Sequence, residues 1–445
     1  MVRCGNAVMP WAQAREEARR LGEQSAWAAG RVVALEDALG AVLARDLTAL
    51  VGVPAYDAAA MDGYAVAGSG PEWSVMGRVL AGASGAAGAV ARLRPGQAVE
   101  IATGAEVPEG TDAVLPYESV VGSASRRVRG EIALGKHVRR AGEDTVAGDS
   151  VLPVGTVVTP AVVGLAASLG HDTLAVRRPR VAAFVTGDEI TASGRPGAGQ
   201  VRDAIGPMLP GIAAWAGAET AGAPRFLRDG FDAMVAALRS AEHRGRTVGA
   251  SGSRAARVGA APPAAPPAEA PPEDGTRVHR QEAAGADVVV VCGASSKGPA
   301  DHLRAALAEV GAAIVVDGVA CRPGHPQLLA RLGTDEEPGP LVVGLPGNPN
   351  AALAAAATLL MPALRAMAGG PDPDPVLPPA MQVKGAIRPH AHDTRLVAVR
   401  ISGGQAEPVG FDRPGSLRGA ALADAYAVVP PGWSGPYAAL LWLPR

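Results

Sequence analysis

Apolar residues recur at helical spacing in two segments near the start of the chain, Trp11 to Leu21 and Leu35 to Leu47. This spacing places the apolar side chains on one helix face, so it predicts two helices that belong together. From Val51 to about Lys136 the apolar residues fall in short runs interrupted by Gly and Pro, which indicates a small inserted β domain. Helical spacing returns at Thr159 to Leu169.

From Pro179 onward, strand-like apolar runs alternate with helical segments; RVAAFVTGD, ADVVVVCG and PLVVGLPGNP are examples of the strands. Such alternation predicts a parallel sheet covered by helices. The stretch from about Glu242 to Ala284 has too few bulky apolar groups to offset its ordering entropy, so we expect a disordered surface insertion. Beyond Gly369, PDPDPVLPP is typical of a stiff linker leading into short strands.

These patterns predict an α/β multidomain protein built around a doubly wound, mostly parallel sheet domain. We expect an N-terminal helical or linker domain at 6–50 and 137–178, an inserted β domain at 51–136, an α/β domain at 179–370 with the disordered insertion at 242–284, and a C-terminal β domain at 371–445.

Composition and charge restrict the class of protein further. The chain has 445 residues, 48% of them hydrophobic but only 3% aromatic, so several aliphatic cores are expected. A formal net charge of −2 gives no general attraction to nucleic acid or to an anionic membrane. Any site for an anion must therefore be local.

Three further features favour a cytoplasmic protein. Cys4, Cys292 and Cys321 are too widely spaced for a disulfide framework or a zinc knuckle. The N-terminus is charged and amphipathic, unlike a signal peptide. The longest apolar run, Ala351 to Leu364, is shorter than the roughly 20 residues that cross a bilayer, so we interpret it as a buried helix.

Ligands of open parallel sheets collect where strands end and loops begin. After one strand, Asp188 and Glu189 either bind magnesium or a ligand hydroxyl, or cap a turn. In GASSKGPAD, the loop 293–301 is either an anion cradle or a helix cap. Asp301 should fall in the first helical turn, and Lys297 either neutralises a phosphate or is solvated.

Two more loops of the sheet domain carry candidate groups. LPGNP, with Asn348 before Pro349, suits either a phosphate site or a simple helix cap. In CRPGHP, Arg322 offers planar donors for an oxyanion or is a surface arginine, and His325 is either a ligand or a turn residue.

Outside the sheet domain, three segments carry polar residues with two interpretations each. Asp62 and Gly63 form a common turn signal, so a catalytic Asp62 competes with a structural turn. Thr103 and Gly104 either line a site or only build a hairpin, and Asp144 is a loop cap or a ligand group.

In combination, these segments resemble the molybdopterin molybdenumtransferase family, which includes bacterial MoeA proteins and the gephyrin E domain. MDGYAV, TGAEVPEGTDAV, RRAGEDTVAGD, PRVAAFVTGDEI, RPGHP and LPGNP occur in the family's order over nearly the whole chain. GSLRGAALADAYAVVPPG is similar to the family's last domain.

The resemblance implies an elongated homodimer whose sheet domain, of the molybdopterin-binding type, faces the inserted β domain of the other subunit. It implies insertion of molybdate into adenylylated molybdopterin with release of AMP, with Mg²⁺ as cofactor. Molybdopterin adenylyltransferase and molybdoenzyme apoproteins are the further partners expected.

The family's site residues are carried over to matching positions only. The implied catalytic residues are Asp62, Asp144, Glu189, Asp229 and Asp301. The implied substrate-binding residues are Thr103, Gly104, Thr186, Gly187, Ser295, Ser296, Lys297, Gly298, Arg322, Pro323, Gly324, Gly347, Asn348 and Ser416. The implied metal ligands are Glu189 and Asp301, and the basic role at molybdate falls on Arg322, with Ser416 in the last domain.

The chain departs from the family pattern at several positions. Ala294 stands in the usual Gly-Gly-Val-Ser segment, adding a methyl where backbone and ligand meet. RPGHP replaces Lys-Pro-Gly-Lys-Pro, and Gly318 lies near another usual lysine, which reduces positive charge at the molybdate site. Asp203, Ala204 and Ile205 replace the usual Asp-Ser-Asn.

Other functions therefore compete with molybdate insertion. The main alternative is a non-enzymatic paralogue that binds molybdopterin as a carrier or scaffold, and retention of the five acids disfavours it. A molybdopterin adenylyltransferase or a nucleotide amidase would resemble the sheet domain alone.

Overall fold

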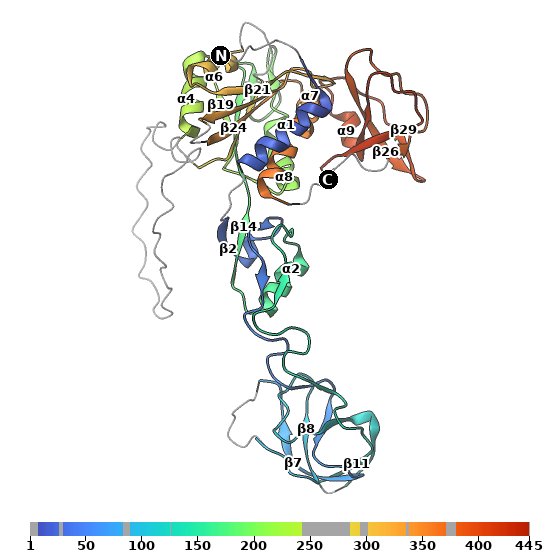
Figure 1. Cartoon of the computed structure of the whole chain (residues 1–445). Coiled ribbons are helices and arrows are strands. Elements are labelled where there is room, and N and C mark those ends of the chain that lie inside the picture. The colour runs from blue at the N-terminus through green and yellow to red at the C-terminus, as the bar shows by residue number, and fades with distance from the viewer. Residues whose placement is uncertain are drawn as a thin grey trace.

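A computed structural model of the chain describes residues 8–25, 30–82, 90–124, 126–242, 285–293, 301–334, 338–370 and 380–444. The chain forms an elongated molecule (Figure 1). A large α/β body and the C-terminal module lie at one end, a small body containing α2 lies in the middle, and a β domain lies at the far end. The expected insertion at 242–284 falls outside the described residues, apart from Glu242.

The far β domain is a six-stranded sheet, as the short apolar runs predict. The strand order is β10-β11-β7-β8-β6-β9. The strands are β6 Gly63–Val66, β7 Glu72–Val79, β8 Gln97–Ile101, β9 Ala113–Pro116, β10 Val120–Ala124 and β11 Arg127–Gly130. Side chains alternate between two apolar clusters, since Val99 belongs to one cluster and its neighbour Ala98 to the other.

The middle body has a core of short strands and one helix. They are β2 Arg31–Ala34, η1 Leu35–Asp37, β3 Val42–Leu43, β4 Leu47–Thr48, β13 Ser150–Leu152, α2 Pro160–Ser168 and β14 Thr173–Arg177. α2 begins as expected, because the Thr159 hydroxyl accepts the Val162 N–H at 3.3 Å and Pro160 occupies the first turn. Two short strands, β5 Ala58–Ala59 and β12 Val138–Arg139, pair where the chain enters and leaves the β domain.

The predicted helix from Leu35 to Leu47 is wrong. Only one 3-10 turn forms there, and β3 and β4 follow it. Gly40 adopts a positive φ of 79°, which interrupts a right-handed helix. Leu43 and Leu47 are buried in the same core, so burial from two separate strands imitates helical spacing.

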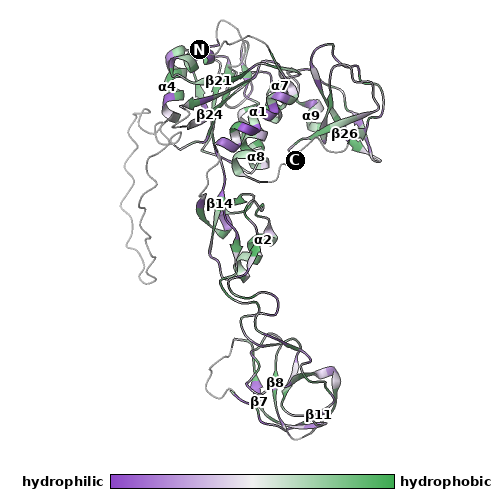
Figure 2. Ribbon diagram, viewed as in Figure 1, coloured by the Kyte–Doolittle hydropathy of each residue, from purple (hydrophilic) through white to green (hydrophobic). Residues whose placement is uncertain are grey.

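The first helix, α1 (Trp11–Gln24), packs on the α/β body rather than on the middle body, so the expected pairing of the two N-terminal segments is also wrong. Its buried residues are mostly small, and a Cβ at Gly22 would overlap the backbone of Ala363. Trp11 Nε1 donates to Thr358 Oγ1 at 3.0 Å. Figure 2 shows hydrophilic residues along α1, as expected of an amphipathic helix with one face in solvent.

The α/β body contains a seven-stranded, mostly parallel sheet, which confirms the predicted fold class. The order is β18-β15-β20-β24-β23-β21, and β19 also pairs with β15. The strands are β15 Arg180–Thr186, β18 Glu219–Thr220, β19 Arg225–Leu227, β20 Val288–Cys292, β21 Ala313–Asp317, β23 Leu328–Gly333 and β24 Pro338–Leu345. Among these strands only β23 is reversed, since it pairs antiparallel with both β24 and β21.

Both faces of this sheet are covered. Val181 and Val185 of β15 belong to one apolar cluster and Phe184 to another, because successive side chains point to opposite faces. One face packs on α4 (Phe231–Glu242) and α6 (Leu303–Glu309). The other packs on α1, α3 (Leu209–Trp215) and the helical run after β24.

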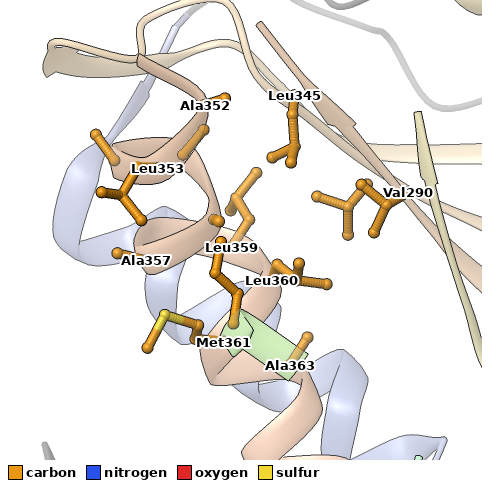
Figure 3. Close-up of a cluster of buried hydrophobic side chains, with 14 of the residues drawn as sticks. Val290, Leu345, Ala352, Leu353, Ala357, Leu359, Leu360, Met361 and Ala363 are labelled. Atoms are coloured by element: carbon orange, nitrogen blue, oxygen red, sulfur yellow. The ribbon is translucent and has the colours of Figure 1, made fainter. Parts of the chain in front are cut away.

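That helical run is continuous from Pro349 to Ala368 and consists of α7 Pro349–Ala355, the π-helical η4 Ala356–Leu360 and α8 Met361–Ala368. Pro362 has no N–H to continue the α-helical bonding, and the π turn precedes it. The run has 20 residues and suffices in length and apolarity to cross a membrane, longer than the sequence suggested. However, 89% of its most apolar 18-residue window is buried inside the protein, and Leu359 and Leu360 lie on the side of the helix toward the sheet (Figure 3).

The C-terminal module consists of β25 Met381–Gln382, β26 Thr394–Ser402, β27 Gln405–Pro408, α9 Arg418–Leu422, β28 Ala425–Val429 and β29 Tyr437–Trp442. Its sheet is extended by strands from elsewhere in the chain. β22 (Val319–Arg322) pairs in parallel with β26, and β1 (Met9–Pro10) pairs in parallel with β22. The module is therefore joined to the α/β body by a shared sheet.

Candidate functional site

A cavity of about 780 Å³ lies at the carboxyl ends of the central parallel strands. Its lining includes seven residues expected at the site, which are Thr186, Gly187, Glu189, Asp229, Asp301, Gly347 and Asn348. They follow or end different strands, so parallel pairing of β15, β20 and β24 brings them to one edge of the sheet.

The ends of β15 and β20 approach each other closely at the cavity wall. Thr186 Oγ1 donates to the Cys292 carbonyl at 3.1 Å. Gly293 has a φ of 93°, and a Cβ there would lie 2.8 Å from the Thr186 carbonyl oxygen. Glycine is therefore required at this position both for backbone conformation and for space.

Three of the four acids that line the cavity come from separate loops. Glu189 follows β15, and Asp229 follows β19 with its N–H donating to Asp188 Oδ1 at 3.3 Å. Asp188 thus links the loops after β15 and β19, whereas the sequence suggested a local cap or a ligand group. Asp301 precedes α6 instead of lying in its first turn, because its Oδ1 accepts the Leu303 N–H at 3.1 Å.

Asp203 is a further cavity acid that sequence reasoning did not select as a site residue. It is buried, and its Oδ1 accepts the N–H groups of Ile205 at 2.9 Å and Gly206 at 3.0 Å. The residues Ala204 and Ile205 also line the cavity, so this departure from the family pattern lies at the site itself. The signal in the sequence was an aspartate at the end of the short strand β17 (Val201–Arg202).

Within the described residues, no three His, Cys, Asp or Glu side chains gather closely enough to hold a metal ion. Magnesium is usually bound by one or two carboxylates together with water and substrate phosphates. Glu189 and Asp301, which share the cavity, fit that mode of binding. Without substrate phosphate, these two carboxylates do not provide a complete magnesium site.

Four expected binding residues, Ser295, Ser296, Lys297 and Gly298, lie outside the described residues. Their loop begins at Gly293, which lines the cavity.

A second cavity, of about 550 Å³, lies where the α/β body meets the C-terminal module. The expected residues Arg322, Pro323 and Gly324 line it, together with Arg395 and Arg413 of the module. Asn348 lines both cavities, so the two adjoin at the start of α7. The pairing of β22 with β26 brings this second group together, and no local motif in the sequence announces it.

Arg322 is held by an acid that sequence reasoning also missed. Its Nε donates to Asp393 Oδ2 at 2.6 Å. Arg395 is held similarly, since its Nη2 lies 2.8 Å from Asp412 Oδ2. Ser416 is not among the described residues that line either cavity; its hydroxyl accepts the Arg418 N–H at 3.4 Å, at the start of α9.

Asp62, Thr103 and Gly104 lie together on the far β domain. Asp62 Oδ1 accepts two hydrogen bonds from Thr103, one from the backbone N–H at 2.7 Å and one from the Thr103 hydroxyl at 2.9 Å. These two bonds, the backbone one foremost, lower the pKa of Asp62. Gly104 has a φ of 78°, so the turn needs glycine.

Asp144 lies in the segment after β12, between the β domain and the middle body, where it forms an ion pair with Arg139. The β domain and the α/β body, whose residues line the cavities, lie at opposite ends of the molecule (Figure 1). A single chain therefore does not bring Asp62 to the cavity acids, and its expected approach to Glu189, Asp301 and Arg322 of a second subunit stays a prediction.

Comparison with known proteins gives consistent matches along the chain. Residues 9–170 match the MoeA N-terminal region (domain I and II), residues 270–366 a probable molybdopterin binding domain, and residues 381–437 the MoeA C-terminal region (domain IV).

Among curated proteins, molybdopterin molybdenumtransferase 2 of Mycobacterium tuberculosis is 33% identical over 77% of this chain and 76% of its own length. The molybdopterin molybdenumtransferase of Bacillus subtilis is 28% identical over 91% of this chain and 86% of its own. The crystal structure of a molybdopterin biosynthesis MoeA protein from Pyrococcus horikoshii has the same fold, with a TM-score of 0.68 at 23% identity. That match covers 99% of this chain and 100% of the other.

Proposed function

Because the chain belongs to the molybdopterin molybdenumtransferase family, we propose that it inserts molybdate into adenylylated molybdopterin and releases AMP. The observation that carries the proposal is the junction of two cavities at Asn348. One is lined by acids at the strand ends, and the other is lined by arginines. An anhydride substrate and a tetrahedral oxyanion need these two environments side by side.

The first cavity suits the nucleotide part of the substrate. Water attacks one phosphorus of the phosphoanhydride, the bond from that phosphorus to the bridging oxygen breaks, and AMP and molybdopterin, which keeps its own phosphate, are formed. Asp229, the expected cavity acid that we do not assign to Mg²⁺, is the group we assign to orient that water and to accept its proton. Main-chain N–H groups near Gly187 and Gly347 can bind phosphate oxygens, because glycine lets a ligand approach the backbone.

The second cavity suits molybdate. Arg322, Arg395 and Arg413 supply positive charge for the oxyanion. As the two dithiolene thiols bond to molybdenum through sulfur, their two protons are transferred to one oxo group, which leaves as water. A protonated carboxyl of the adjoining cavity is the general acid we assign to this step.

We also propose that Mg²⁺ is bound by Glu189 and Asp301 together with substrate phosphate. When bound, the ion supplies positive charge that polarises the phosphoanhydride.

The test is incubation of the protein with adenylylated molybdopterin, molybdate and Mg²⁺, with measurement of AMP and of molybdenum cofactor. We expect both products from the unmodified chain and neither at a comparable rate from Glu189→Gln. Glu309→Gln is the matched control, because Glu309 is an exposed acid of the same body, paired with Arg239. Equal rates for the Glu189→Gln and control variants would reject the assignment.

A non-enzymatic molybdopterin carrier is the second candidate function. The pairing of Arg322 with Asp393 favours it, because this pair offsets positive charge at a site where the sequence has already lost lysines. Binding of adenylylated molybdopterin without release of AMP, in the same incubation, would support the carrier and reject the transferase.

We further propose a homodimer in which Asp62 of one chain completes the site of the other. The separation of the β domain from the cavities supports this arrangement. Mixing Asp62→Asn chains with Glu189→Gln chains should restore activity, because each mixed pair then contains one intact site. At random pairing, about a quarter of all sites would be intact. No recovery on mixing would contradict the shared site.

We place the protein in the cytoplasm. Cys292 and Cys321 are free and buried, which fits a reducing compartment. There, molybdopterin adenylyltransferase would supply its substrate and molybdoenzyme apoproteins would receive its product.

A further inference from the structure

Arg322 is the cation that the proposed function assigns to molybdate, and one carboxylate controls the orientation of its guanidinium. The Arg322 side chain is 62% exposed, whereas the Asp393 side chain is only 11% exposed, and their Nε to Oδ2 distance is 2.6 Å. A nearly buried acid thus holds the inner nitrogen of a mostly exposed cation. We propose that Asp393 is a positioning residue that aims the two terminal nitrogens of Arg322 at the oxyanion.

The backbone fixes Asp393 relative to Arg322. Arg322 is the last residue of β22, and it lies opposite Arg395 in the parallel pairing with β26. Asp393 immediately precedes β26. Since the two strands belong to different parts of the chain, the Asp393 to Arg322 bond links the C-terminal module to the oxyanion-binding loop.

His390 holds the turn before β26 without competing for Asp393. Its Nδ1 accepts the N–H groups of Asp393 at 3.0 Å and of His392 at 3.3 Å. A ring nitrogen that accepts carries no proton to donate, although it lies 3.4 Å from Asp393 Oδ2. Arg322 is therefore the donor that satisfies this carboxylate oxygen.

Among the residues that the structure describes, Arg322 donates through Nε to Asp393, and its two terminal nitrogens make no hydrogen bond. A guanidinium has its remaining four N–H groups on the two terminal nitrogens, and these form the fork that recognises oxyanions. A lysine has no second nitrogen by which an acid could hold it while it binds a ligand. The arginine in place of the family's lysine and the buried Asp393 thus form one unit.

The neighbouring thiol adds no negative charge to this site. Burial, followed by the charge of Asp393, raises the pKa of Cys321 to about 12. The thiol therefore stays neutral at the pH of the cytoplasm. Asp393 is then the negative charge beside Arg322, and its repulsion of molybdate opposes its positioning effect.

Removal of the Asp393 charge has two opposing effects on molybdate. Loss of a nearby negative charge strengthens attraction of the anion, but the exposed end of Arg322 lies in solvent that screens this gain. Asn offers the Nε–H only a neutral and weaker acceptor, so the guanidinium rotates away from the ligand more easily, and screening does not reduce this effect. We therefore expect weaker binding, and the sign of the change distinguishes positioning from charge repulsion.

The experiment compares Asp393→Asn with the unmodified protein. We expect the KM for molybdate to rise about tenfold or more, the usual effect of losing a hydrogen bond to a charged group. The KM for adenylylated molybdopterin and the Tm should change little. Glu407→Gln is the matched control, because Glu407 is paired with Lys384 in the same module, away from the cavity. In an Arg322→Lys background, Asp393→Asn should have almost no further effect on the molybdate KM.

This inference rests on the proposed function, so a readout without turnover is included. Equilibrium dialysis with molybdate alone should show the same loss of affinity for Asp393→Asn. Absence of AMP release by the unmodified protein would reject the proposed function, while a molybdate affinity that depends on Asp393 would still support the inference. An unchanged or tighter molybdate affinity in Asp393→Asn, or an equal fall in every parameter together with the Tm, would overturn it.

Discussion

Asn350 and Tyr426 join the α/β body to the C-terminal module, and removing Asn350 should loosen that junction measurably. The Tyr426 hydroxyl donates to Asn350 Oδ1 at 2.9 Å, and Asn350 Nδ2 donates to the Arg413 carbonyl at 3.2 Å. Tyr426 is 1% exposed and Asn350 4%. Burial also raises the pKa of Tyr426, so its hydroxyl remains a donor at neutral pH.

The expected cost follows from the groups left without partners. Asn350→Ala strands a buried hydroxyl, at about 1 to 3 kcal/mol, and loses the bond to a partly buried carbonyl, at about 1 kcal/mol. The total is about 2 to 4 kcal/mol. The N–H groups of Asn350 and Ala351 still donate to the Pro414 carbonyl, so the loop should stay attached.

Tyr426→Phe should cost about 1 to 2 kcal/mol, because it leaves only an amide oxygen without its donor. The double variant should cost about 1 kcal/mol less than the sum of the two single changes, since the second substitution removes the stranded partner.

Hydrogen exchange of the β28 amides measures the opening free energy of the module directly. The same variants should raise the molybdate KM, because Arg413 lines the second cavity. Additive single effects, with no coupling between the two substitutions, would refute this explanation of the junction.

Three further predictions concern packing and pH. Gly22→Ala should force α1 away from α8 and lower the free energy of unfolding by about 1 to 3 kcal/mol, measured by denaturant titration; an unchanged midpoint would contradict the close contact. Gly293→Ala should abolish AMP release while Gly311→Ala, at an open turn, leaves it intact; equal activities would show that the cavity wall tolerates a Cβ. The pKa of Cys321 is raised from near 9 to about 12, so folding favours the protonated thiol, and this stabilisation is complete below pH 9 and is lost as pH rises through about 12. Cys321→Ala should therefore lose less stability than the unmodified protein between pH 8 and pH 11, as followed by denaturant titration at each pH.

The sequence predicted those helices and strands whose pattern of apolar residues or end signals arises within one continuous segment. Val288 to Cys292 is an unbroken apolar run because β20 is covered on both faces, and it was assigned correctly as a strand. The helix after Pro349 was also predicted, because Asn348 and Pro349 mark its start. At the site, loops after parallel strands could be grouped in advance because topology brings strand ends together.

The failures arose where distant segments share one core or one sheet. Leu43 and Leu47 imitate a helix because both are buried from separate short strands. Asp393 and Arg395 could not be assigned because the pairing of β26 with β22, which no local pattern encodes, brings Asp393 to Arg322 and Arg395 to the second cavity. Long-range pairing of this kind depends on the whole fold.

The middle body is tied to the α/β body by two stretches of chain, one after α1 and one between β14 and β15. Across this junction, Glu219 lies within ion-pair distance of Arg31, Arg178 and Arg180. A domain held by one connecting segment can rotate about it. A domain held by two connecting segments side by side can bend but resists rotation. We therefore expect the far β domain to move mainly by bending at this junction, with little rotation about the long axis of the molecule. This restricts the positions that Asp62 can reach.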